Sequence, residues 1–319
     1  MQLIRYFQEQ HLSGCVATIG NFDGVHLGHQ ALLKQLVALS QRQGLPSLVM
    51  SFYPLPHEFF HPEQACRLMD FQSKYKILAE LGVDYFVCHR FNPRFAQLSA
   101  EEFIMEVLRK ALRVEHLLVG ADFRFGHKAT GDAALLKSYS LKKAFSLEVI
   151  NFVSDSGDKI SSSRIRSAIL AGKMREAQAL LGRPYTLSAP VQHGRKKGRE
   201  LGFPTANLSI HPKFIMLNGV YTCWVNIAGK QYQAVANVGY APTVKNQKKT
   251  VEVHVLDFSG DLYGQRIEVA FLDKVRDELK FPSLAELIDA IKHDIMSARQ
   301  FFAEMTDSFR INKPAQPIR

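Results

Sequence analysis

Hydrophobic positions follow two different patterns along the chain, and the change comes near residue 183. Before that point, short apolar runs alternate with stretches in which apolar residues recur at the spacing of a helix. Strands separated by helices predict a parallel, doubly wound α/β sheet, and ligands of such sheets bind beyond the carboxyl ends of the strands. The strands predicted in this half are residues 15–20, 46–53, 83–91, 116–122 and 146–153.

Two of the connecting helices carry clear end signals. Residues 29–43 place leucines on one face, and Gly44 is expected to end this helix. Ser99 and Glu102 match a capping box, in which each side chain binds the backbone N–H of the other residue, at the start of a further helix. The first half thus has the element order of an α/β domain.

After residue 183 the pattern changes to short strands with turns between them. Ala228-Gly229 predicts a hairpin turn. A closed antiparallel barrel is favoured because closure leaves no strand edge exposed. Ser283 and Glu286 match a second capping box, which opens one long terminal helix. The strands predicted in this half are residues 185–194, 219–227, 230–239, 250–258 and 266–275.

Length and composition fit an ordinary globular protein of two domains. The chain has 319 residues, of which 46% are hydrophobic and 22% charged. The change of pattern predicts domains at residues 1–183 and 184–319. No apolar run approaches the roughly 20 residues of a membrane-spanning helix, and the first residues lack the apolar core of a signal peptide. The four cysteines lie far apart, so we expect no disulfide framework or structural zinc site, and a cytoplasmic protein with reduced thiols.

The chain is basic, with a formal net charge of +10 from 40 Lys and Arg against 30 Asp and Glu residues. Such a balance suits anionic partners, which include nucleotides, nucleic acids and membrane surfaces. The densest basic run, residues 193–199, contains no aromatic residue on which a base would stack. Charge alone therefore favours a solvated basic loop.

A ten-residue string, Gly20 to His29, lies where the first predicted strand ends and the first helix begins. Its glycines let the backbone approach a ligand, and a helix N-terminus attracts a phosphate group. His26 and His29 flank the same end, and imidazole N–H groups stabilise charge that develops on phosphate oxygens. A His-x-x-His pair alone is commonly structural, and a zinc site is disfavoured because no further ligands lie at a suitable spacing. The whole string at a strand–helix junction is much more specific.

A second polar string follows the fifth predicted strand and opens a helix. Ser161, Ser162 and Ser163 supply three hydroxyl groups, and Arg166 adds a positive charge. Hydroxyl groups at a helix start either cap the helix or bind phosphate. Because both strings follow strands of one doubly wound sheet, we expect them to reach the same crevice.

The segment Gly194 to Asn207 combines glycines and basic residues with the sequence Pro-Thr-Ala-Asn. Backbone N–H groups and basic side chains of such a loop bind phosphates. The neutral oxygens of Thr205 and Asn207 suit a Mg²⁺ ion that ATP phosphates also hold. The segment is no Walker A loop, because GxxxxGK[ST] is absent. A turn made by Pro204 and capped by Asn207 is the structural alternative.

The motifs of the first half resemble those of the nucleotidyltransferase superfamily, and above all the bacterial FAD synthetase module. The resemblance rests on GNFDGVHLGH, the Phe-x-Pro-x-Pro segment at residues 52–56, the string DFRFG from Asp122, and the serine string, in which Ser163 replaces the usual Thr. In the second half, GRKKGRELGFPTAN, GVY, NVGYAPT, VEVH and DLYG follow in the order of riboflavin kinases. Residues 276–281 are similar to that family's flavin-side segment, with Asp277 where Pro or Asn is frequent.

The resemblance implies an enzyme that phosphorylates riboflavin to FMN and adenylylates FMN to FAD, with ATP as co-substrate of both reactions and Mg²⁺ held by Thr205 and Asn207. It also implies an N-terminal adenylyltransferase and a C-terminal six-stranded β-barrel kinase with a terminal helix. The ionised FMN phosphate attacks the α-phosphorus of ATP, so His26 and His29 align and neutralise charge. The ribityl 5′-hydroxyl of riboflavin needs a proton acceptor, for which Glu252 is chosen. The sequence leaves open whether Glu252 faces inward or outward.

Further binding residues are implied in both halves. For the adenylyltransferase they are Gly20, Phe22, Asp23, Gly24, Gly28, Asp122, Ser161, Ser162, Ser163 and Arg166. For the kinase they are Gly194, Lys196, Gly198, Arg199, Gly202, Pro204, Thr205, Asn207, Arg276 and Phe281.

Two other functions compete with this interpretation. One is a monofunctional nucleotidyltransferase, for instance one acting on pantetheine phosphate, with a degenerate barrel. The intact Pro-Thr-Ala-Asn sequence and Glu252 argue against it. The other is a nucleic-acid-binding protein, for which the chain lacks a recognised RNA or DNA motif. We therefore expect small-molecule partners, and neither nucleic acid nor a membrane.

Overall fold

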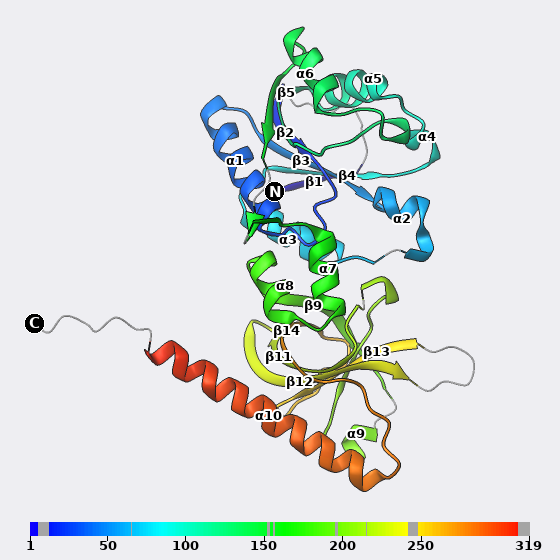
Figure 1. Ribbon diagram of the computed structural model, residues 1–319, viewed down its shortest axis with the longest axis vertical. Coiled ribbons are helices and arrows are strands. Elements are labelled where there is room, and N and C mark those ends of the chain that lie inside the picture. The colour runs from blue at the N-terminus through cyan, green and yellow to red at the C-terminus, as the bar shows by residue number, and fades with distance from the viewer. Residues whose placement is uncertain are drawn as a thin grey trace, which may run out of the picture. The chain divides into compact units, whose positions relative to one another are not determined.

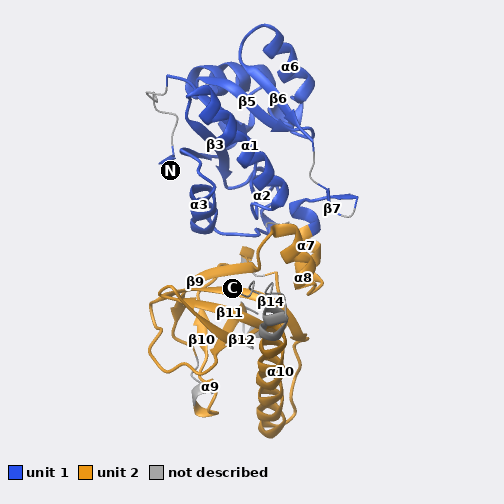
Figure 2. Ribbon diagram, turned by 90° about the vertical axis from the view of Figure 1, so that its left-hand side faces the viewer, with its two compact units in different colours: residues 1–164 blue, residues 165–319 orange. Residues whose placement is uncertain are grey.

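The computed structural model describes residues 1–5, 13–64, 66–151, 154–155, 157–194, 197–214, 216–241 and 248–311. It consists of two compact units, Met1–Arg164 and Ile165–Arg319, shown in blue and orange in Figure 2. The second unit begins before residue 183 because helix α8, Met174–Leu181, packs against its strands β9 and β14. The functional boundary at residue 183 stays a prediction.

The first unit is built on a six-stranded parallel sheet with the order β1-β4-β3-β2-β5-β6 (Figure 1). The predicted doubly wound parallel sheet is therefore confirmed. The chain proceeds outward from β2 on one side and from β5 on the other, so the crevice for ligands is expected beyond the carboxyl ends of these two strands. The strands are β1 Gln2–Ile4, β2 Cys15–Ile19, β3 Ser47–Tyr53, β4 Tyr85–Arg90, β5 Val114–Gly120 and β6 Ser146–Ile150.

Strand β1 is missing from the sequence prediction, which has five strands in this half. It has only three residues, and it pairs with β4 in parallel register from Gln2↔Tyr85 to Ile4↔Val87. A run of three residues is too short to show an apolar period, so only the pairing identifies it as a strand.

Helices cover both faces of this sheet. Val16 and Val49 belong to the core formed with α1 and α3, whereas Ala17 and Met50 belong to the core formed with the π-helix η2. Both faces of the central strands β2 and β3 are buried, which explains their continuous apolar runs. The helical segments are α1 Leu27–Gln43, α2 Pro56–Phe60, η1 Pro62–Gln64, α3 Phe71–Glu80, α4 Pro93–Ala96, α5 Ala100–Glu102, η2 Phe103–Ala111, η3 His127–Ala129 and α6 Ala133–Leu141. A small ribbon pairs β7 Ser154–Asp155 with β8 Asp158–Lys159.

The predicted helix ends are confirmed in this unit. Gly44 ends α1 in the left-handed conformation, with φ 64°. At the start of α5, the Glu102 backbone N–H donates to Ser99 Oγ (3.0 Å) and the Ser99 backbone N–H donates to Glu102 Oε2 (2.8 Å). The local signals in the sequence therefore set these boundaries without help from tertiary contacts.

The second unit contains a closed antiparallel barrel with the order β10-β13-β12-β11-β14-β9, as predicted. Its sixth strand, β10, is the short segment Ala206–Leu208 inside the Pro-Thr-Ala-Asn region. The hairpin turn predicted at Ala228-Gly229 is confirmed, with φ 49° and 84°. The other strands are β9 Tyr185–Gln192, β11 Gly219–Ile227, β12 Lys230–Ala241, β13 Lys248–Val255 and β14 Arg266–Arg276.

Helices α7 Ser162–Leu170, α9 Lys197–Glu200 and α10 Leu284–Ile311, with the 3₁₀ turn η4 Pro212–Phe214, complete the elements. Ser283 caps α10, since its Oγ accepts a hydrogen bond from the Glu286 backbone N–H (3.2 Å) and donates to the Glu286 carboxylate (3.1 Å). The predicted start of the terminal helix is therefore confirmed. Within the described ranges no helix is both long and apolar enough to cross a membrane. All four cysteines are free thiols.

Candidate active sites

The loop between β2 and α1 holds an unusual backbone shape. Phe22 has φ 45° and Val25 has φ 37°, in the left-handed region that residues other than glycine rarely adopt. Both side chains are almost completely buried, and this apolar burial offsets the strain. The loop therefore presents its backbone in one defined conformation at the carboxyl end of β2.

His26 and His29 are coupled at the start of α1. His26 is the N-cap residue, and its Nδ1 accepts a hydrogen bond from the His29 backbone N–H (3.3 Å), so the proton of the neutral ring lies on Nε2. The two rings stack with their centroids 3.7 Å apart. Burial, with help from the charges of His26, Lys74 and Lys159, holds the pKa of His29 well below its usual range. His29 is therefore a neutral imidazole at pH 7, and its buried Nδ1 makes no hydrogen bond within the described part of the chain.

Most of the adenylyltransferase residues chosen from the sequence line one cavity of about 450 Å³ at the carboxyl ends of β2 and β5. Asp23, Gly24, Ser163 and Arg166 do not line it. The chosen residues that do are Gly20, Phe22, His26, Gly28, His29, Asp122, Ser161 and Ser162.

The serine string, residues 161–163, is hydrogen-bonded to the loop between β2 and α1 that leads to the two histidines. Ser162 Oγ donates to the Asp23 backbone oxygen (2.9 Å), which ties the two strings together. The Asp23 carboxylate is buried and accepts hydrogen bonds from the Leu68 backbone N–H at 3.1 and 3.2 Å. Asp23 therefore supports the loop from inside the protein and does not line the cavity, although we expected it among the ligand-binding residues.

Four polar residues of this cavity are not among the site residues chosen from the sequence: Asn21, Arg124, Asn151 and Lys159. Lys159 forms an ion pair with Asp122, and Arg124 forms one with Asp132 (3.4 Å). Lys159 lies two residues before Ser161, and a cation so close to the serine string could have identified it as a candidate site residue from the sequence. Lys159 and Arg124 thus add positive charge to the lining of the cavity, which suits an anionic ligand.

A second cavity of about 490 Å³ shares five lining residues with the first, among them Phe52 and Phe123. Seven of its seventeen lining residues are phenylalanines, and their rings pack on one another, edge to face between Phe91 and Phe95 (5.7 Å) and stacked between Phe123 and Phe125 (5.5 Å). An apolar cavity of this size suits a flat aromatic ligand. The phenylalanines that line it are Phe52, Phe60, Phe91, Phe95, Phe103, Phe123 and Phe125.

In the barrel, strand register places Glu252 between two asparagines. Glu252 pairs with Asn207 of β10 on one side and with Asn237 of β12 on the other. Its neighbours Val251 and Val253 are buried inside the barrel, so Glu252 lies on the outer face. The orientation that the sequence left open is thus outward, with a carboxylate and two amides in one row across three strands.

The glycine-rich loop reaches the same row. A Cβ atom at Gly194 would collide with the Asn207 side chain, so the chain passes this close only as glycine. Gly198 accepts a hydrogen bond from the Phe203 backbone N–H (2.8 Å) and lies beside Thr205. Gly202 adopts φ 86° before Pro204. Lys196 lies outside the described residues, as does the side chain of Arg199.

Pro204 and Thr205 also line a cavity of about 260 Å³ together with Asp261 and Tyr263. Glu252 and Asn207 do not line that cavity. No group of three His, Cys, Asp or Glu residues in the described ranges is arranged to hold a metal ion. The oxygens of Thr205 and Asn207 match the hard ligands that Mg²⁺ takes when substrate phosphates complete its shell.

Arg276 and Phe281, chosen as flavin-side residues, lie together. The Arg276 guanidinium forms two hydrogen bonds of 2.8 Å with the buried Asp294 carboxylate and lies 5.5 Å from the Phe281 ring centroid. Glu278, which the sequence did not single out, packs onto Gly239, where any Cβ atom would collide with it. The colliding atoms are the exposed carboxylate end of Glu278, so this side chain would have to shift if Gly239 were replaced.

Comparison with known proteins gives matches in both units. The family model of FAD synthetase matches residues 8–164, and that of riboflavin kinase matches residues 181–302. The bifunctional riboflavin kinase/FMN adenylyltransferase of Escherichia coli (strain K12) is 43% identical over 291 residues, which is 91% of this chain and 93% of that protein. The protein of the same name from Pseudomonas fluorescens is 42% identical over 307 residues, 95% and 98% of the two chains. A solved structure named as a macrolide-efflux protein from Streptococcus pneumoniae has a TM-score of 0.83 and 33% identity, covering 93% of this chain and 98% of that one.

Proposed function

The chain belongs to the family of bifunctional riboflavin kinase/FMN adenylyltransferases, and we propose from this premise which residues carry each reaction. The enzyme phosphorylates riboflavin to FMN and then transfers AMP from ATP to FMN, giving FAD and pyrophosphate. Because both family models match, a monofunctional nucleotidyltransferase with a degenerate barrel is not favoured. The absence of a nucleic-acid partner stays a prediction.

Adenylyl transfer takes place in the histidine-lined cavity of the first unit. The observation that carries this assignment is the cavity in which His26, His29, Ser161 and Lys159 converge beyond β2 and β5. The FMN phosphate attacks the α-phosphorus of ATP, and pyrophosphate leaves. His26 Nε2–H and His29 donate hydrogen bonds to the α-phosphate oxygens, and Lys159 neutralises their charge.

The isoalloxazine ring of FMN occupies the adjoining phenylalanine cavity. The shared wall at Phe52 and Phe123 lets one ligand reach from the aromatic walls to the phosphate-binding loop. Offset stacking on aromatic rings holds a flat heterocycle without requiring charged partners. The flavin is thereby oriented so that its phosphate points toward the histidines.

Riboflavin phosphorylation takes place on the outer face of the barrel. The Glu252 carboxylate accepts the proton of the ribityl 5′-hydroxyl as that oxygen attacks the γ-phosphorus of ATP, and ADP leaves. Thr205 and Asn207 hold Mg²⁺, which neutralises phosphate charge when bound. Arg276 and Phe281 contact the flavin. Incubating the protein with riboflavin and MgATP and separating the flavins tests both activities at once, since FMN must appear before FAD.

Replacing Phe60 with Ala tests the flavin cavity. Phe60 lines it and is 58% exposed, so its ring can be removed at little cost to folding. We expect the KM for FMN in FAD formation to rise roughly 3–10-fold, the effect of losing one aromatic contact, with kcat nearly unchanged. Leu141→Ala is the matched control, because Leu141 is 78% exposed and lies outside the cavity. An unchanged KM in the Phe60 variant would show that the flavin does not bind in this cavity.

A fragment tests the modularity of the chain. Residues 184–319 contain all six barrel strands and α10, so we expect them alone to convert riboflavin to FMN. A longer fragment from Ile165 keeps α8, whose Leu180 and Leu181 are buried. It should therefore melt about 2–4 °C higher, as expected when a domain of this length gains roughly 1 kcal/mol of stability. A folded fragment without kinase activity would show that the kinase depends on the first unit.

A further inference from the structure

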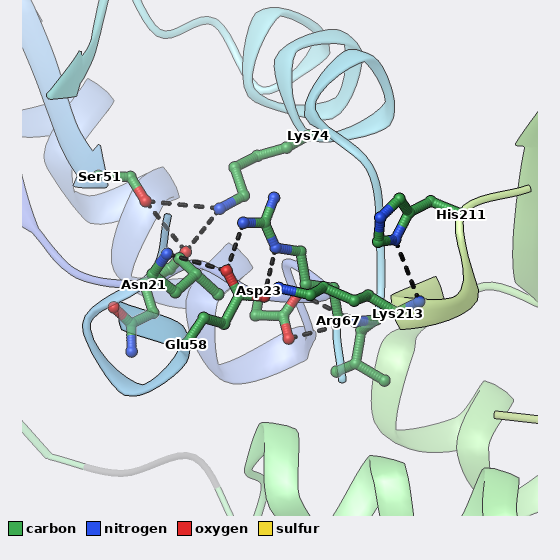
Figure 3. A network of polar contacts seen from close by, with 10 residues as sticks. Asn21, Asp23, Ser51, Glu58, Arg67, Lys74, His211 and Lys213 are labelled. Carbon is green, nitrogen blue, oxygen red and sulfur yellow. Dashed lines mark hydrogen bonds and ion pairs between the residues drawn. The ribbon is translucent and has the colours of Figure 1, made fainter. Parts of the chain in front are cut away.

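A buried lysine lies behind the histidine loop. Lys74 of α3 is only 7% exposed, and its Nζ donates a hydrogen bond of 2.7 Å to the backbone oxygen of Asn21 (Figure 3). Ser51 Oγ of β3 donates to the same oxygen (3.1 Å), and Nζ also lies 3.4 Å from Ser51 Oγ. The Asn21 carbonyl is thus held by two donors, Lys74 and Ser51, neither of which lines the ligand cavity.

Asn21 lies next to a constrained position of the loop between β2 and α1. It precedes Phe22, whose φ is 45°, and it lines the histidine-lined cavity. A carbonyl fixed at this position sets the direction in which the following peptide groups and the two histidines are presented. Because the left-handed conformation costs energy, contacts outside the loop have to hold it.

Opposing influences act on the charge of Lys74, and their net effect lowers its pKa. Burial lowers the pKa of the Lys74 ammonium, whereas the neighbouring carboxylates of Asp23 and Glu58 and the Cys88 thiol favour its charged form, and Arg67 opposes it. Burial is the main cause of the lowered pKa of His29, and the charge of Lys74 adds to it, as do those of His26 and Lys159. Lys74 therefore acts on the loop in two ways: its Nζ donates a hydrogen bond to the Asn21 carbonyl, and its charge contributes to the lowered pKa of His29.

We propose that Lys74 is a positioning residue for adenylyl transfer, which holds the Asn21 carbonyl in place by a hydrogen bond from the side opposite the ligand cavity. The proposal rests on the assignment of FAD formation to the histidine-lined cavity. Lys74 touches neither FMN nor ATP; it acts through the loop that does.

Lys74→Met keeps the length of the side chain and removes the ammonium. We expect kcat for FAD formation from supplied FMN to fall on the order of tenfold, as a small displacement of aligned groups does, while the KM for FMN changes little. The pKa of His29, followed by NMR of histidine-labelled protein with the signal assigned from His29→Ala, should rise because one positive neighbour is gone. Lys76→Met, on an exposed position of the same helix, should behave as the unmutated enzyme in both measurements.

Ser51→Ala separates geometry from charge and serves if the Lys74 variant fails to fold. It removes the second donor to the Asn21 carbonyl without altering charge, so FAD formation should fall roughly 2–10-fold while the pKa of His29 stays in place. The proposal is overturned if Lys74→Met forms FAD at the unmutated rate with an unmoved His29 pKa, or if Ser51→Ala has full activity. If His29→Ala itself leaves FAD formation intact, the assignment of the cavity is wrong, which is a different result.

Discussion

Glu252→Gln is expected to slow riboflavin phosphorylation by roughly 10²–10⁴, the usual contribution of a general base. The substitution keeps the size of the side chain and its place between Asn207 and Asn237 but removes the group that accepts the 5′-hydroxyl proton. The loss should appear in kcat, since an interaction with the reacting proton forms only in the transition state. Initial rates of FMN formation from riboflavin and MgATP measure it.

The same preparation supplies the control. FMN given directly should become FAD at close to the unmutated rate, because that reaction uses the cavity of the other unit and an ionised nucleophile. Glu268→Gln is the matched barrel variant, since Glu268 also alternates with buried neighbours on its strand, β14, and should retain kinase activity. MgATP binding should persist because the proposed metal ligands, Thr205 and Asn207, are unchanged.

Normal kinase activity in the Gln variant would show that Glu252 is not the general base. Other carboxylates of the barrel would then have to be tested. Asp257 forms two hydrogen bonds with Arg299, at 3.0 and 2.7 Å, and this pairing holds its pKa below the usual range. Asp261 lines the cavity that contains Thr205. Asp261 would therefore be the next candidate base.

The sequence predicted the parts of the fold that depend on local chemistry. Gly44, Ser99 and Ala228-Gly229 act within a few residues of their own position, so their helix ends and turn follow from residue type alone. The closed barrel followed from many short strands that need their edges covered. Strand β1 was missed because its identity depends on pairing with β4, more than 80 residues away in the sequence.

The orientation of Glu252 shows where alternation stops being informative. A period of two assigns Glu252 and His254 to one face and the valines to the other, but it does not say which face becomes the interior. Closure of the barrel decides this, because the small interior takes the apolar side chains of Val251 and Val253 and excludes a carboxylate. The row with Asn207 and Asn237 then follows from strand register, which no single segment contains.

The phenylalanine cavity and the role of Lys74 could not be predicted from the sequence either, because both depend on contacts between separate segments. Phe60, Phe91 and Phe125 come from three separate segments, and each looks like an ordinary core residue in its own segment. Lys74 sits in an amphipathic helix where a lysine is normally a surface residue, and only its burial beside Asn21 and Ser51 distinguishes it. Lys159, by contrast, was within reach of local reasoning, since it precedes the serine string by two residues.

His29→Ala is expected to lower FAD formation by roughly 10²–10³, the usual effect of removing one donor that stabilises charge in the transition state. His29 lines the cavity at the start of α1, and its pKa lies well below the usual range because of burial and the nearby charges of His26, Lys74 and Lys159. Its neutral form is therefore present from mildly acidic to alkaline pH. The rate of FAD formation should accordingly show no loss near pH 6.5 from protonation of this ring, which a pH profile of kcat with FMN and MgATP measures.

The histidine variant also discriminates between a catalytic and a structural role. His29 gives its backbone N–H to His26 Nδ1, a bond that alanine retains, so α1 should keep its N-cap and the first unit its thermal stability. FMN formation from riboflavin should stay near normal because Glu252 and the glycine-rich loop belong to the barrel. Equal loss of both activities would indicate misfolding or a shared site and would contradict the assignment. A loss confined to FAD formation, with unfolding temperature unchanged, would leave donation to the α-phosphate as the role of His29.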